Sequence, residues 1–281
     1  MSALSLGLIA ALAWGFHDIC VRFVSQKAPL MASLLTVLST GLLFHFAFMI
    51  VTDGFHETPA NAVVPAILAG VFFLIASLGL YGAFQRGPVR LVAPIIASFP
   101  ILSVLWAAFT GANVTLVEWL AVLVILCGVT IVAYLSDQSE DDNLPKGITI
   151  FFAAIASLGY ASTFAFGQMA AEMSHHLPAT LITRSTAIVL LICGIVVWKL
   201  PFWPGRKSLG LLMLMGLADG VALLCMISAG GLPKAEYAAV AASVFGLITI
   251  VLAWGFLKEK MTFPQWVGCA VAFAGIGYLA L

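Results

Sequence analysis

The chain has 281 residues, of which 63% are hydrophobic and 9% are charged, whereas a typical soluble domain carries about 25% charged residues. No water-soluble globule can bury so large an apolar fraction, so the composition excludes an ordinary soluble domain and predicts a protein solvated by lipid. The formal net charge of zero argues against a nucleic-acid partner.

Ten apolar runs follow one another along the chain, and each is long enough to cross a bilayer as a helix, which needs about 20 residues. Their ranges are 4–24, 31–51, 63–85, 88–110, 116–135, 147–170, 178–198, 208–229, 233–257 and 263–281. The fold class that we predict is an all-α polytopic membrane protein with ten transmembrane helices.

The second half of the chain repeats the first. The segment 136–146, with four acids and one proline, is the predicted linker between a five-helix repeat at 1–135 and another at 147–281. At an offset of 145 residues the halves share Pro88 with Pro233, Ala93 with Ala238, Ala97 with Ala242 and Ser98 with Ser243. The alternative is chance similarity between helices rich in alanine and glycine.

Five spans per repeat is an odd number, so the second repeat must enter the membrane from the opposite side. Inverted repeats of this kind typically enclose a substrate site near the middle of the membrane. Ten of the twelve lysines and arginines lie on the side opposite the N-terminus, and Arg184 and Lys234 lie on its own side. The positive-inside rule then places both termini outside the cytoplasm.

Polar residues inside spans are costly in lipid, so each is a candidate for function. The first span contains Trp14, His17, Asp18 and Arg22. Asp18 and Arg22 are four residues apart on one helical face and could form an ion pair that fixes packing. Alternatively, His17 or Asp18 binds substrate or carries a coupling proton, because histidine titrates near neutral pH.

The third span carries Ser77, Tyr81 and Gln85 at intervals of four residues, which gives it one polar face. Lipid would not favour this face, so we expect it to point inward toward substrate. The alternative function of these side chains is hydrogen bonding between helices.

Two later spans also contain buried polar groups. The sixth carries Tyr160 and, beside it, Ser162, and the eighth carries Asp219 within an apolar run. A carboxylate at such a depth needs a partner or a proton. Asp219 is therefore a candidate binding residue, unless it lies near enough to an interface to be solvated.

The fourth and ninth spans differ from the others in their prolines and small residues. Pro94 and Pro100 interrupt the fourth span, and they predict a bend that could act as a gate or be a static kink. Ser98 and Ser243 occupy equivalent positions in stretches rich in alanine. Small residues let helices approach closely, so packing is the first interpretation of these stretches and cavity lining the second.

Four features of the sequence belong together: Trp14-Gly15, residues 238–243, Lys258-Glu259-Lys260 and the ending Gly268 to Gly275. In these features the sequence resembles the EamA-type repeat of the drug/metabolite transporter superfamily. It looks most like the ten-helix exporters of amino acids. The resemblance implies a central cavity, open alternately to each side, with Trp14, His17, Tyr81, Tyr160 and Ser243 near it.

The sequence departs from the family pattern at two residues, Asn113 in place of Glu and Phe245 in place of Pro. Members of the family are also commonly drawn with cytoplasmic termini, which disagrees with the charge count.

We therefore expect a secondary transporter of the bacterial cell inner membrane that exports small solutes, with apolar or aromatic amino acids first and nucleosides or drugs as alternatives. Its expected partners are the solute and the lipid bilayer, and it is expected to be a monomer. No Walker motif is present, so ATP is not the direct energy source, and we expect no cofactor.

Two other classes of protein fit the sequence less well. A channel needs a ring of like groups, usually from an oligomer. An intramembrane enzyme is disfavoured because the sequence contains neither G-x-S-x-G nor H-E-x-x-H. The five cysteines form no C-x-x-C pair, so we expect no metal site either.

Overall fold

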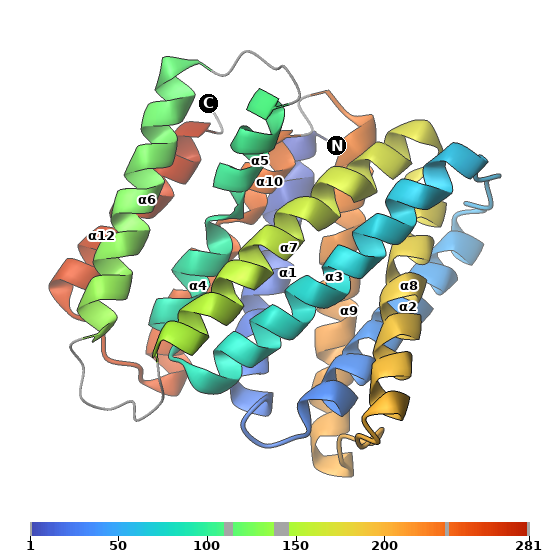
Figure 1. The fold of residues 1–281 in the computed structure, drawn as a ribbon, viewed down its shortest axis with the longest axis horizontal. Helices are drawn as coiled ribbons and strands as arrows, with labels where there is room; N and C mark the ends of the chain where they lie inside the picture. The colour runs from blue at the N-terminus through green and yellow to red at the C-terminus, as the bar shows by residue number, and fades with distance from the viewer. Residues whose placement is uncertain (1, 110–114, 138–145, 234–235, 280–281) are drawn as a thin grey trace.

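The computed structural model describes residues 2–109, 115–137, 146–233 and 236–279, and all the regular elements in these ranges are helical (Figure 1). The helices of the first half are α1 (Ala3–Val24), α2 (Leu30–Val51), α3 (Ala60–Arg86), α4 (Val89–Ala97), α5 (Phe99–Phe109) and α6 (Leu116–Asp137). Those of the second half are α7 (Lys146–Met173), α8 (His176–Val197), α9 (Arg206–Ser228), α10 (Glu236–Ala242), α11 (Phe245–Leu252) and α12 (Phe263–Leu279). The short turn η1 (Ala229–Gly231) follows α9, and the π-helical turn η2 (Ala253–Leu257) follows α11.

Within the described residues, seven helical segments are long and apolar enough to cross a bilayer, and Val89–Leu102 is a shorter apolar helix. The protein is therefore an all-helical membrane protein. The count of ten transmembrane helices remains a prediction, and most of the predicted linker, together with Asn113 and Lys234, lies outside the described residues.

Two of the predicted spans are broken in the middle. The span predicted at 88–110 becomes α4 and α5, with Ser98 between them and Pro94 and Pro100 on either side. The prolines explain this break, because each lacks the N–H that an unbroken helix requires. The span predicted at 233–257 is also broken, between α10 and α11, although it has no proline there.

The two breaks share a serine. Ser98 donates its hydroxyl to the Ile95 backbone oxygen over 2.7 Å, and Ser243 donates to the Val240 oxygen over 2.7 Å. Each hydroxyl thus satisfies a carbonyl that the broken helix leaves without its ordinary partner. The helices α4 and α11 also approach each other closely: a Cβ added to Gly246 of α11 would stand 2.6 Å from the Cβ of Ala97 of α4.

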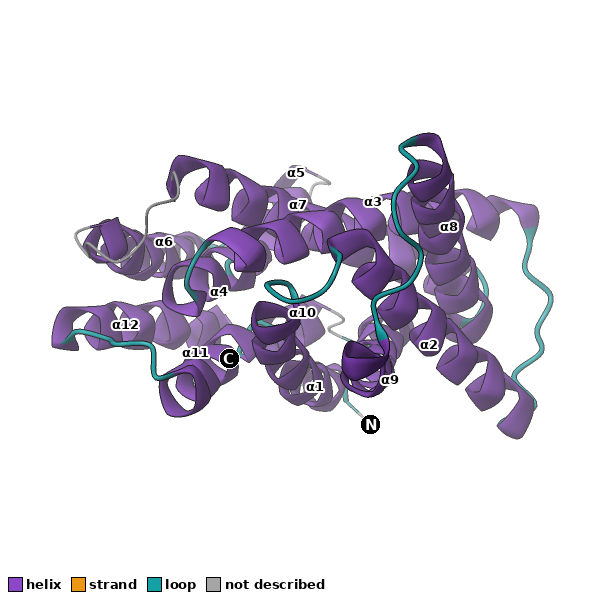
Figure 2. Cartoon of the chain, turned by 90° about the horizontal axis from the view of Figure 1, so that it is seen from below, coloured by secondary structure: helices purple, strands orange, loops and turns teal. Residues whose placement is uncertain are grey.

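The helices form a flattened bundle (Figures 1 and 2). α3 and α7 pack side by side, α6 and α12 pair at one end, and α2, α8 and α9 pack together at the other. The α3–α7 contact depends on glycine, since a Cβ at Gly79 would lie 2.7 Å from the Phe152 backbone oxygen. α1 lies between the two ends, against α9, α10 and α11.

The surface and the interior are those of a membrane protein. Large apolar side chains such as Leu43, Phe151 and Phe263 are exposed, while several charged and polar side chains are buried. This distribution suits a protein with lipid around it and a polar centre.

Candidate functional site

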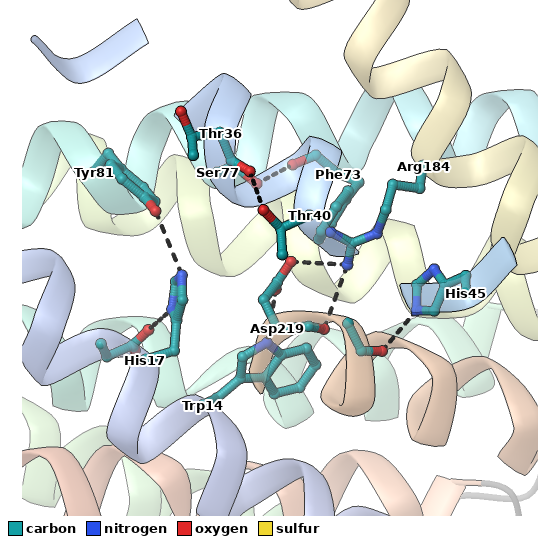
Figure 3. A network of polar contacts seen from close by, with 12 residues as sticks. Trp14, His17, Thr36, Thr40, His45, Phe73, Ser77, Tyr81, Arg184 and Asp219 are labelled. Carbon is teal, nitrogen blue, oxygen red and sulfur yellow. Dashed lines mark hydrogen bonds and ion pairs between the residues drawn. The ribbon is translucent and has the colours of Figure 1, made fainter. Parts of the chain in front are cut away.

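The centre of the bundle holds a buried ion pair between α8 and α9 (Figure 3). Arg184 Nη2 lies 2.8 Å from Asp219 Oδ2 and donates a second hydrogen bond, of 3.3 Å, to the backbone oxygen of Asp219. Trp14 of α1 donates its indole N–H to Asp219 Oδ1 over 3.1 Å. The guanidinium also lies 5.2 Å from the centre of the Phe73 ring of α3. Four helices therefore meet at one carboxylate and its cation.

Because both side chains are buried, each charge of this pair depends on the other for its stabilisation. The side chain of Arg184 is 0% exposed and that of Asp219 is 5% exposed, so neither charge is solvated. Removing one partner of such a pair typically costs about 3–5 kcal/mol, because the other charge is left buried and uncompensated. Asp219 is thus matched to an interior partner, and the alternative of solvation near an interface is wrong.

A second pair lies nearby on α1 (Figure 3). His17 Nδ1 donates to Asp18 Oδ1 over 2.9 Å, and His17 Nε2 lies 3.5 Å from the Tyr81 hydroxyl of α3. The alternative of an ion pair between Asp18 and Arg22 is not what the structure shows: Arg22 donates to the Phe84 backbone oxygen over 2.7 Å.

A small cavity of about 10 Å³ lies beside the two pairs. Its lining residues are Trp14, Asp18, Leu80, Phe99, Tyr160, Phe164 and Phe245. The rings form a continuous cluster, with centroid distances of 5.5 Å from Trp14 to Phe164 and 5.9 Å from Trp14 to Tyr160. A volume of this size accommodates about one water molecule. Phe245, one of the two departures from the family pattern, forms part of the wall.

A third polar contact joins the two halves of the chain away from the cavity. Glu259, in the connection between η2 and α12, accepts hydrogen bonds from the backbone N–H groups of Val89 and Arg90 over 3.0 and 3.2 Å. These groups are the first two of α4, where a helix has unpaired donors and a partial positive charge. Arg22 Nε lies 4.0 Å from the same carboxylate, and Arg90 donates to the Lys260 backbone oxygen over 3.1 Å. We call this arrangement the Glu259 cap.

The predicted site serines donate to backbone oxygens three or four residues earlier in the chain. Ser77 and Ser162 donate to the backbone oxygens of Phe73 and Leu158 over 2.8 and 3.0 Å. Ser98 and Ser243 do so at the helix breaks described above. Gln85 lies exposed at the end of α3 and donates to the Ser25 backbone oxygen over 3.2 Å. The structure thus brings Trp14, His17, Asp18, Tyr81, Tyr160 and Asp219 together at the centre.

Arg184 is the central residue that the sequence analysis did not identify as part of the site. The charge count places it among residues on the N-terminal side of the membrane, whereas it lies within α8. The sequence did contain a signal for Arg184, because an arginine within a long apolar run is unusual. It contained none for Phe99, Phe164 and Phe245 of the cavity wall, because phenylalanine is common in any apolar core.

Three histidines lie close together, beyond the C-terminal end of α2 and at the N-terminal end of α8. The rings of His56 and His175 lie 4.0 Å apart, and those of His175 and His176 lie 4.1 Å apart. Burial, together with the neighbouring His56, lowers the pKa of His175, which precedes α8. No group of three potential ligands with metal-binding geometry occurs in the described part of the chain.

Known proteins are similar to this chain in sequence and in fold. A putative sugar uptake protein of Lactobacillus helveticus is 22% identical over 165 residues, which cover 56% of this chain and 57% of that protein. The uncharacterized inner membrane transporter YedA of Escherichia coli (strain K12) is 21% identical over 265 residues, which cover 92% of this chain and 84% of that protein.

A crystal structure that is 15% identical in sequence covers 99% of this chain and 98% of its own, with a TM-score of 0.75. This likeness shows the fold. The pattern of the EamA-like transporter family matches the chain twice, at residues 1–134 and 147–281. The resemblance inferred from the sequence is confirmed, and the chain belongs to the EamA-like transporter family of membrane transporters.

Proposed function

We propose that this chain is a secondary transporter that exports small solutes, with apolar or aromatic amino acids as the first class, across the bacterial inner membrane by alternating access. The observation that carries the proposal is the pairing of charged groups with an aromatic cavity at the centre of the bundle. Asp18 and Trp14 line the cavity, and Trp14 also binds Asp219. Ionisable groups inside a membrane domain typically mark the path of a substrate or a coupling ion.

Inverted five-helix repeats and ten spans are part of this proposal. The packing supports them. The helices α1, α2, α3 and α4–α5 of the first half correspond in order to α7, α8, α9 and α10–α11 of the second. In the following pairs, when each helix is replaced by its counterpart, the new pair is also in contact. α3 packs on α7 as α9 packs on α1, and α2 packs on α9 as α8 packs on α3. α1 contacts α10 and α11, and correspondingly α7 contacts α4 and α5. Transporters built in this way move one repeat against the other around a central site.

The size of the cavity supports a mechanism with alternating conformations. About 10 Å³ is far too small for an amino acid, so the bundle must open for a solute to enter. The Glu259 cap joins the two halves away from the cavity and is a candidate gate, together with the breaks next to Pro94 and Pro100.

The charge count supports termini outside the cytoplasm. Because Arg184 is buried in the interior, it no longer counts for the N-terminal side of the membrane. Ten lysines and arginines then lie on the opposite side and one, Lys234, on the N-terminal side.

Flux in proteoliposomes tests the proposal. We expect radiolabelled phenylalanine or another apolar amino acid to show saturable counterflow that accelerates with unlabelled solute on the opposite side. Sugars belong in the same panel, because a relative is described as a putative sugar uptake protein, and nucleosides are the other alternative. Conductance that rises linearly with concentration would instead indicate a channel, and conversion of a solute would indicate an enzyme.

A further inference from the structure

One carboxylate oxygen in the cavity wall has no hydrogen-bond partner. Asp18 is 1% exposed, and its Oδ1 accepts from His17, whereas its Oδ2 has no partner among the described residues. A buried polar atom without a partner is costly, so a hydrogen-bond donor placed beside Oδ2 would be favourable. Asp18 also lines the aromatic cavity, so the cavity can supply the missing partner.

The charges at the centre indicate what kind of partner is missing. Asp219 is neutralised by Arg184, which reaches it through two hydrogen bonds. Asp18 has only His17, which is charged only if protonated. With His17 neutral and both carboxylates ionised, the four described central side chains carry two negative charges and one positive charge, which leaves Asp18 without a cation. A cation would remove this excess, and an anion would increase it.

The walls of the cavity suit an organic cation. Trp14 has Phe164, Tyr160 and Phe245 around it, with ring centroids at 5.5, 5.9 and 6.2 Å. Aromatic faces attract a cation through their quadrupole, with tryptophan the strongest, and they also accept an apolar chain or ring. An ammonium group can therefore approach Asp18 while the apolar part of the same molecule contacts these rings.

We propose that Asp18 Oδ2 accepts the ammonium group of the transported solute, which makes an amine with an apolar or aromatic body the substrate class of this protein. The inference rests on the proposed transport function and narrows it. Arg184 Nε and Nη1 also lack a hydrogen-bond partner among the described residues, but Arg184 does not line the cavity, so the amine is the required group and a carboxylate is not. Arylalkylamines without a carboxylate should bind, and aryl carboxylates without an amine should not.

Binding to the purified protein tests this inference independently of transport. The probes are phenethylamine and phenylacetate, which share the ring but differ in charge, and the readout is the shift in thermal unfolding temperature as each is titrated. We expect phenethylamine to stabilise the wild-type protein and phenylacetate to have no effect. Asp18→Asn, which keeps the shape and removes the charge, should weaken phenethylamine binding at least about tenfold. Asp18→Glu should restore part of it.

Asp53→Asn is the matched control, because it makes the same chemical change at an exposed residue whose positive φ of 49° asparagine tolerates. It should bind phenethylamine as the wild type does. Equal binding of the two probes, or unchanged phenethylamine binding in Asp18→Asn, would overturn the amine site. Counterflow reports separately on transport, so binding of the amine without any solute flux would overturn the transport function and leave the amine site standing.

Discussion

At the scale of single residues, the pairing of Arg184 with Asp219 shows what sequence could and could not predict. Trp14, His17, Asp18 and Asp219 were identified because polar groups stand out in an apolar run. Their partners could not be predicted. One alternative paired Asp18 with Arg22, four residues away on the same face, yet its neighbour His17 binds it. Asp219 pairs with Arg184, 35 residues away in the chain. Which of these pairs forms depends on how each helix is rotated against the others.

The ion pair leads to a prediction about stability. Arg184→Met should destabilise the protein by about 3–5 kcal/mol, because it leaves Asp219 buried without its cation. The double substitution Arg184→Met with Asp219→Leu should recover most of this loss, since no charge remains unpaired. Thermal or denaturant unfolding in detergent measures both, with Arg206→Met, at an exposed residue, as the control for the loss of an arginine. If the double variant were less stable than the single one, the pair would have a different role.

At the scale of helices, the sequence predicted where most of them lie but only one of the two breaks. Pro94 and Pro100 indicated a bend in the fourth span, because proline interrupts the hydrogen bonds of a helix. The equivalent break after α10 has no proline, so the local sequence does not predict it. It occurs at Ser243, and just beyond it Gly246 packs against Ala97 of α4. This break therefore depends on tertiary packing, which sequence patterns do not report.

The Glu259 cap gives a prediction about α4. Glu259→Ala should destabilise the protein by about 0.5–2 kcal/mol, because the first two N–H groups of α4 lose their acceptor. Glu259→Gln should cost less, since its amide oxygen can still accept a hydrogen bond. Unfolding measurements decide this, with Glu57→Ala at an exposed residue as the control. Equal stability of the Glu259→Ala and Glu57→Ala variants would show that the cap contributes nothing.

At the scale of the whole molecule, the two halves of the chain contact each other at the Glu259 cap, at the α3–α7 interface and at the histidines outside the apolar core. His56 follows α2 in the first half, His175 directly precedes α8 in the second, and His176 is the first residue of α8. Nothing in the sequence indicates that His175 and His176 lie near His56, because residues between two helices carry no local signal of their neighbours. Only the packing of α2 against α8 brings His56 to them.

The histidines lead to a prediction about pH. The pKa of His175 falls below its ordinary value of 6.5 in the folded protein, first through burial and then through the neighbouring His56. Below this ordinary value the unfolded chain binds more protons than the folded one, so stability decreases as pH falls through about 6.5. His175→Asn, which keeps an acceptor for the Leu177 backbone N–H, should reduce this decrease and leave stability near pH 8 almost unchanged. Unfolding temperatures across this range, compared between the two proteins, measure the effect, and identical profiles would contradict it.

The small volume at the centre also bears on what the protein does when no solute is present. A space for about one water molecule, lined by Asp18, Leu80 and five aromatic rings, does not hold the hydration shell of an ion. This conformation should therefore not conduct ions. A cell could hold many copies of the protein in its membrane without dissipating the ion gradients that supply its energy.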